Sequence, residues 1–85
     1  MARTEHFYLL GSIDPVRLGQ AIVVPLRHVE TPFEMAPEVW SDLGAAWALA
    51  RAHLAPFQPD GFTIGWNVGA VAGQEIFHAH LHVIA

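Results

Sequence analysis

The chain has 85 residues, 53% of them hydrophobic, which is enough for one small domain, and its lack of cysteine excludes disulfides, thiolate zinc sites and a catalytic thiol. Its formal net charge is −4 without any lysine, and its 4 arginines are scattered, which excludes the basic stripe of a nucleic-acid groove. The sequence shows no signal segment and no apolar run near the roughly 18 residues that span a bilayer. We therefore expect a cytoplasmic protein that binds neither nucleic acid nor membrane.

The first half of the chain predicts two strands and a helix. Residues 6–10 predict a short strand, and residues 20–24 predict a β-branched strand that Pro25 closes. A helix of about five turns is predicted to begin at Pro37, because apolar residues then recur at helical spacing. These residues are Trp40, Leu43, Trp47, Ala50 and Leu54. We assign Trp40 and Leu43 to the core, and part of the remaining stripe to either the core or a dimer contact.

The second half predicts two further strands that share one pattern. In residues 62–67 the large apolar residues alternate, and in residues 77–83 apolar residues alternate with histidines. The link between these strands, residues 68–76, is short, which favours antiparallel neighbours. The apolar face of the last strand is predicted to pack on the helix, and its other face to carry the histidines into a cleft. The apolar set is Phe77, Ala79, Leu81 and Val83, and the other set is His78, His80 and His82.

These three histidines form the strongest chemical pattern in the sequence. Burying three imidazoles in a row is costly unless each has a hydrogen-bond partner and a purpose. A zinc site is one purpose, but the backbones of His78 and His82 lie about 13 Å apart in a strand, while zinc binds nitrogen at about 2.0–2.1 Å. The other is nucleophilic catalysis, because a neutral imidazole is a good nucleophile near pH 7. We favour a central His80 as nucleophile and interpret His6 and His53 as structural or surface residues.

A glycine-containing loop leads directly into the histidine strand. Gly69 and Gly73 allow backbone N–H groups to approach an anion closely, and Asn67 and Gln74 add neutral donors. The loop alone is equally compatible with an ordinary hairpin. Because the chain has no lysine, a phosphate ligand would be held mainly by histidines and amides.

Residues 78–84 resemble the His-φ-His-φ-His-φ-φ signature of histidine triad proteins, in which φ is apolar. The resemblance extends upstream to residues 59–67, 72–74 and 19–28, and covers most of the chain from Pro15 to Ile84. Galactose-1-phosphate uridylyltransferases are less similar, because their motif lacks the third histidine. The sequence is therefore identified as a member of the histidine triad family.

The resemblance implies an α+β fold, in which one long helix packs on an antiparallel sheet, as a single domain over residues 1–85. It implies a homodimer formed through an extended sheet and the long helix, and the large apolar fraction of so small a domain favours the same state. It also implies hydrolysis at a nucleotide α-phosphate through a nucleotidyl-histidine intermediate, with dinucleoside polyphosphates or nucleoside phosphoramidates as substrates. No metal or other cofactor is expected.

The resemblance also assigns roles to individual residues. His80 would be the nucleophile, His82 and the backbone at Gly73 and Gln74 would hold phosphate oxygens, and Asn67 would lie nearby. His78 would support the site through its backbone and ring, and His28 would assist without touching the substrate. Leu10 and Ile13 lie where the family lines its base pocket.

The sequence departs from the family at several positions. Ser12 replaces an acidic residue that binds ribose, Leu26 replaces a basic residue, and Glu75 replaces a serine or threonine. Both ends are short, which is consistent with either a minimal member or a fragment. Transfer of the nucleotide to phosphate, nucleotide binding without turnover, and metal binding remain open as alternatives.

Overall fold

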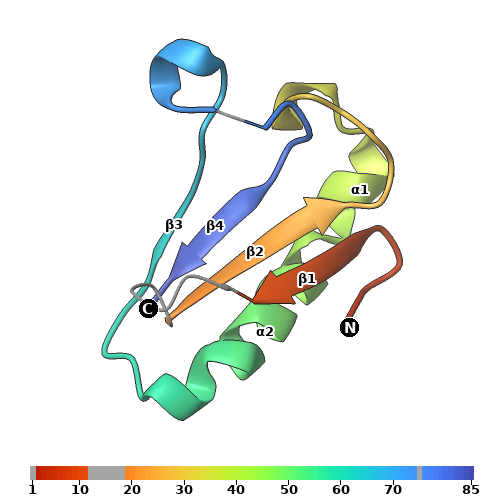
Figure 1. Cartoon of the computed structure of the whole chain (residues 1–85). Helices are drawn as coiled ribbons and strands as arrows, with labels where there is room; N and C mark the ends of the chain where they lie inside the picture. The colour runs from red at the N-terminus through yellow and green to blue at the C-terminus, as the bar shows by residue number, and fades with distance from the viewer. Residues whose placement is uncertain (1, 12–18, 75) are drawn as a thin grey trace.

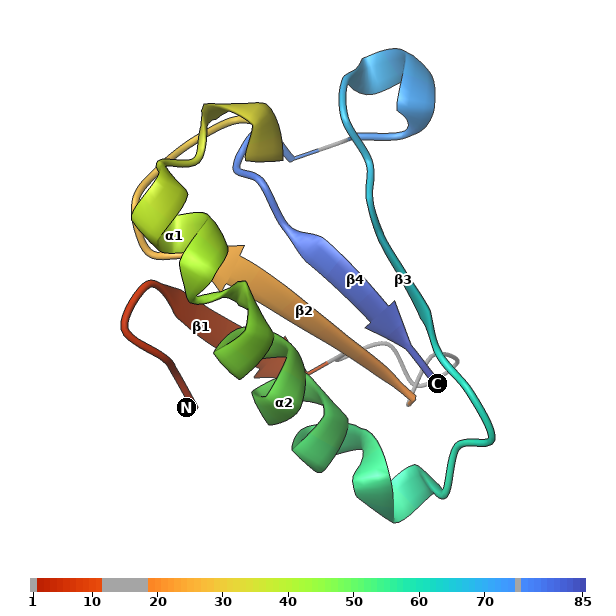
Figure 2. The same ribbon diagram turned by 180° about the vertical axis from the view of Figure 1, so that it is seen from behind.

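The computed structural model describes residues 2–11, 19–74 and 76–85, which form one antiparallel sheet with helices on one face (Figures 1 and 2). The strand order is β1-β2-β4-β3. The strands are β1 (Phe7–Gly11), β2 (Gln20–Pro25), β3 (Thr63–Trp66) and β4 (Leu81–Ile84), and the helices are α1 (Pro37–Ser41) and α2 (Leu43–Leu54). Short 3₁₀ turns are η1 (Pro32–Glu34), η2 (Ala55–Phe57) and η3 (Ala70–Ala72). The predicted α+β fold is confirmed, and no helix of the described residues is long and apolar enough to cross a membrane.

Strand β4 lies inside the sheet, between β2 and β3. Leu81 pairs with Val23 of β2 and with Trp66 of β3, and both pairings are antiparallel as predicted. The ladder begins at Leu81, later than the predicted strand, because the Ala79 N–H donates to the Val29 carbonyl at 2.7 Å instead of to a neighbouring strand. The chain therefore enters the sheet between His80 and Leu81.

The core lies between the sheet and α2. Leu81 and Val83 are 1% and 3% exposed, and the facing helix residues Ala46 and Ala50 are 1% and 0% exposed. Because alanine has only a methyl side chain, the helix approaches β1 and β2 closely, and Leu54 fills its far end. The predicted burial of the apolar set is confirmed for Ala79, Leu81 and Val83, whereas Phe77, predicted on the same face, is 48% exposed because it precedes the strand.

The predicted long helix is interrupted at Asp42, which separates α1 from α2. The Asp42 N–H donates to the Val39 carbonyl, three residues back, which is the tighter 3₁₀ pattern. Trp40 is 43% exposed, so its assignment to the core was wrong, whereas that of Leu43 is confirmed. Val39 packs against the core in place of Trp40, and the next residue along a helix points away from that face.

The Asp42 carboxylate fastens the first strand to this helix junction. Its Oδ2 accepts hydrogen bonds from the Thr4 hydroxyl at 2.5 Å and from the His6 N–H at 2.9 Å. The Thr4 hydroxyl is the main reason that the pKa of Asp42 lies below its ordinary value. Partial burial acts in the opposite sense, and the His6 N–H adds to the lowering. The ionised carboxylate therefore stabilises the folded chain.

We expect Thr4→Val to lower the free energy of unfolding by about 1.5–3 kcal/mol at neutral pH, because it removes a hydrogen bond to a charged carboxylate and the one that Thr4 accepts from the Phe7 N–H. A folded pKa below the unfolded one stabilises the protein above the ordinary carboxyl pKa of about 3.9, and this effect is lost as the pH falls through the folded pKa. The difference between wild type and variant should therefore narrow below about pH 4. Urea unfolding at several pH values measures it, with Thr63→Val at an exposed position as control. A difference that widens in acid would contradict this role of Asp42.

Candidate functional site

The sheet face opposite α2 carries His80 and His82, because Leu81 and Val83 alternate with them and face the helix. No helix of the described residues covers this face (Figure 1). Strand register places His82 beside Ile22 of β2 and Gly65 of β3, and places Leu10 of β1 beside Ile22. Leu10 is 42% exposed, so the predicted base-pocket residue lies on the face and in the row of His82.

The space beside His82 is open on the β3 side. A Cβ added to Gly65 would meet no heavy atom within 4 Å other than its chain neighbours. A larger side chain at this position would project from the same face as His82. Gly65 thus leaves room for a ligand against the histidines.

The hydrogen bond of the His80 ring determines which of its nitrogens carries the proton. Its Nδ1 lies 2.9 Å from the carbonyl oxygen of His78. A carbonyl only accepts, so Nδ1 carries the proton, and Nε2 of the neutral ring holds the lone pair. This is the tautomer that a nucleophilic imidazole needs, and the backbone of the same segment imposes it.

His82 lies beside His80, with the ring centroids 4.9 Å apart and the planes at 70°. Its Nδ1 lies 3.0 Å from Nε2 of Gln20, a residue of β2 that is only 7% exposed. Sequence reasoning missed Gln20. The available signal was an amide at the start of an otherwise apolar β-branched strand.

His78 belongs to a second pair rather than to one row of three rings. Its Nε2 donates to the Pro25 carbonyl at 2.9 Å, and its ring meets that of His28 edge-on, with the centroids 4.8 Å apart. His28 itself is exposed. The predicted supporting residues are thus in mutual contact, and they connect the start of the histidine segment to the end of β2.

Hydrogen bonds from the side-chain amides of Asn67 and Gln74 hold the loop of residues 67–74 together. Gly69 and Gly73 have φ of 84° and 95°, a region that glycine tolerates best. Gln74 is 3% exposed; its Oε1 accepts from the Gly69 N–H, and its Nε2 donates to the carbonyls of Glu30 and Ile76. Asn67 donates from Nδ2 to the Ala72 carbonyl at 2.6 Å.

The backbone amides predicted to hold phosphate are also engaged within this loop. The Gly73 N–H donates to Ala70 and the Gln74 N–H to Gly69. A phosphate bound by them would have to compete with these bonds. The predicted Ile13 and the departures Ser12 and Glu75 lie outside the described residues. Within the described ranges, no group of three His, Asp or Glu side chains converges closely enough to hold a metal ion.

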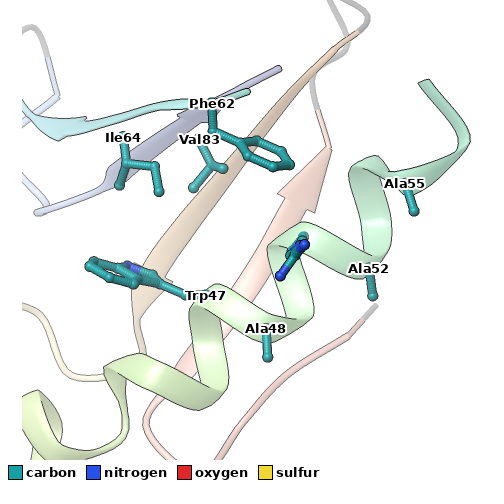
Figure 3. A pocket seen from close by; sticks show the side chains of 8 residues that line it. Trp47, Ala48, Ala52, Ala55, Phe62, Ile64 and Val83 are labelled. Carbon is teal, nitrogen blue, oxygen red and sulfur yellow. The ribbon is translucent and has the colours of Figure 1, made fainter. Parts of the chain in front are cut away.

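A large hollow lies on the other face of the sheet, away from His80 and His82. It has a volume of about 580 Å³ and lies between α2 and the strands β3 and β4 (Figure 3). Its lining is mostly apolar, with Trp47, Phe62, Ile64 and Val83, and includes one charged side chain, Arg51. None of the described residues that line it offers a nucleophile, so we assign the candidate site to the histidine face despite the size of this hollow.

Comparison with known proteins identifies the family. A model of the HIT domain matches residues 1–85. The chain belongs to the HIT domain family. The Bacillus subtilis protein named "Protein hit" is 35% identical to it over 81 residues, which are 94% of this chain and 56% of that protein. A crystal structure of a HIT family member from Bacillus subtilis has a TM-score of 0.85 and 33% identity, over 99% of this chain and 60% of that one.

Some relatives in the HIT family have names that state an activity, among them the adenylylsulfatase HINT3 of Arabidopsis thaliana, which is 33% identical over 72 residues, 84% of this chain and 36% of that protein. The bis(5'-adenosyl)-triphosphatase of Dictyostelium discoideum is 32% identical over 82 residues, 95% of this chain and 55% of that protein. Several other relatives are described only as uncharacterised HIT-like proteins. The chain spans little more than half the length of the Bacillus and Dictyostelium relatives.

We expect Gln74→Met to loosen this HIT domain around the loop that precedes the histidines. The substitution removes the acceptor of the Gly69 N–H and the donor to the Glu30 and Ile76 carbonyls. Each of these groups that is left buried and unpaired costs about 1–3 kcal/mol in stability. The Gly69 amide should lose its hydrogen-exchange protection, while the Leu81 amide in β4 should remain protected. Equal protection of Gly69 in both proteins would show that Gln74 does not hold the loop.

Proposed function

We propose that this HIT domain hydrolyses nucleotides at the α-phosphate through an intermediate on His80. The observation that carries the proposal is the hydrogen bond between His80 Nδ1 and the His78 carbonyl, which leaves the lone pair on Nε2. A nucleophile with its second nitrogen held by an acceptor is the arrangement that covalent catalysis by histidine requires. The triphosphatase named among the relatives supports a dinucleoside polyphosphate as substrate. Nucleoside phosphoramidates present the same α-phosphate.

The reaction has two steps. His80 Nε2 forms a bond to the α-phosphorus, and the bond from phosphorus to the leaving group breaks, so that the leaving group departs with the bonding pair. Water then attacks the same phosphorus and releases a proton to solvent, the P–N bond breaks, and Nε2 regains its lone pair. The phosphoryl oxygens carry the negative charge throughout, so donors beside His80 accelerate both steps.

The sheet face around His80 can hold the rest of a nucleotide. Ile22 and Leu10 provide an apolar surface one strand and two strands away from His82, respectively, which suits a nucleobase. Gly65 leaves the neighbouring space on β3 open. Asn67 keeps one amide hydrogen beyond its bond to Ala72 and is exposed at the end of β3. A nucleoside across β1 and β2 would thus direct its phosphate toward His80.

We expect His80→Ala to retain nucleotide binding but to lose at least about 10³-fold in kcat, because the covalent route is removed. Quenched reactions of the wild type with a dinucleoside polyphosphate should give a nucleotidyl adduct on His80 in peptide mass spectrometry. The matched control is His53→Ala on α2, away from the histidine face, which should keep wild-type rates. Turnover by His80→Ala close to the wild-type rate would refute the nucleophile assignment.

We also propose that the HIT domain is a homodimer that pairs across the open edge of β3. Strand β3 is the last strand of the sheet, and the apolar hollow between it and α2 is open to solvent. Trp47 and Ile64, at 44% and 43% exposure, stand on the two sides of this hollow (Figure 3). A second copy would bury this apolar surface and pair the free strand edge.

We expect Ile64→Arg to give a monomer where the wild type is a dimer, because an unpaired charge would be buried between the copies. Light scattering after size exclusion at micromolar concentration measures the mass. The matched control is Val71→Arg, which places the same charge on a fully exposed apolar residue of η3 and should leave the mass unchanged. A wild type that elutes as a clean monomer would refute the dimer.

A further inference from the structure

The buried amide of Gln20 is unexpected in its surroundings. Gln20 is the first residue of β2 and is 7% exposed, and the strand continues with apolar residues. Burying an amide without a partner costs free energy that an apolar side chain of similar size would avoid. The Gln20 amide has such a partner in the site, because its Nε2 lies 3.0 Å from His82 Nδ1.

This contact determines where the proton of His82 resides. The nitrogen of an amide donates and does not accept, so His82 Nδ1 must be the acceptor. In the neutral ring the proton then lies on Nε2. His80 has the opposite arrangement, since its Nδ1 donates to the His78 carbonyl. Two rings in edge-on contact at 4.9 Å therefore carry complementary tautomers, one with a lone pair on Nε2 and one with a proton there.

We propose that Gln20 is a positioning residue that sets the tautomer of His82, so that His82 Nε2–H donates to an oxygen of the phosphoryl group that His80 attacks. The role in phosphoryl binding rests on the proposed function, whereas the tautomer is a property of the unliganded protein. A donor held in this way needs no positive charge of its own. That suits a chain without lysine, because oriented neutral donors also stabilise negative charge on a phosphoryl group.

Two changes at this position separate the proposal from a purely structural role. Gln20→Met fills the same volume without a donor, so His82 loses its preference for the Nε2–H form. Gln20→Glu places an acceptor at the same distance, which reverses the polarity and draws the proton to Nδ1. If Gln20 only filled space, both variants would change the stability of the protein but not the tautomer of His82.

The first test is the tautomer of His82 in the unliganded, ¹⁵N-labelled protein at about pH 8, where an ordinary imidazole is neutral. Two-bond ¹H–¹⁵N correlations distinguish a protonated from an unprotonated ring nitrogen. We expect Nε2–H on His82 and Nδ1–H on His80 in the wild type, and Nδ1–H on His82 in Gln20→Glu. The control is Thr63→Val, at an exposed position of β3, which should match the wild type. A wild-type His82 in the Nδ1–H form would show that Gln20 presents its oxygen instead, and would overturn the proposal without any variant.

The second test is kinetic. Partners that orient a functional imidazole are typically worth about 10- to 100-fold in activity, so we expect kcat of Gln20→Met to fall by that factor with a smaller change in KM. A kcat within twofold of the wild type would overturn the role in phosphoryl binding. A wild type without hydrolytic activity would instead remove the proposed function and leave the tautomer result standing. If Gln20→Met does not fold, Gln20→Glu provides the same comparison.

Discussion

The register of β4 between β2 and β3 is the constraint on which the rest of the structure depends. Leu81 and Val83 are buried against α2, and this burial determines which face of the strand turns to the core and which to the opposite side of the sheet. Each buried apolar side chain contributes about 1.5–3 kcal/mol, so a shift by one residue would expose both and bury two histidines in the core. The hydrophobic core therefore holds His80 and His82 on the opposite face, although neither imidazole contributes to it. Core residues and residues of the candidate site therefore alternate along this one segment.

The same constraint explains how the backbone prepares the chemistry. Because β4 enters the sheet at Leu81, the His78 carbonyl is not used in a strand ladder and can accept from the His80 ring. On the other side, pairing of β2 with β4 brings Gln20 to the His82 ring. Both rings thus receive their orientation from groups whose positions are set by strand pairing. The site is part of the sheet rather than an addition to its surface, so its tautomers follow from the fold.

Much of this arrangement could be predicted from the sequence, because alternation and helical spacing are local signals. The strands around Val23, Ile64 and Leu81, the helix that buries Ala50 and Leu54, and the common face of His80 and His82 were all readable in this way. The break at Asp42 was not, and neither was the hydrogen bond that its carboxylate accepts from Thr4, 38 residues away in the chain. The separation of His78 from the other two rings depends on the hydrogen bond from the Ala79 N–H to the Val29 carbonyl. The hydrogen bonds that Gln74 makes to hold its loop include one to the distant Glu30 carbonyl. Periodicity contains no information about such pairings, which appear only once the chain is folded.

The placement of the apolar hollow has a consequence for the histidine site. Val83 lines the hollow and His82, one residue earlier, lies on the site face, so the two surfaces are the opposite sides of one strand. Strand β3 borders both: Ile64 faces the hollow, while Gly65 lies on the face of His82. In the described structure β3 is paired on one side only, and edge strands are the part of a sheet that opens most easily. A second copy on this edge would therefore hold the wall of the site in place, and the proposed homodimer would couple the assembly of this HIT domain to its proposed chemistry through one short strand.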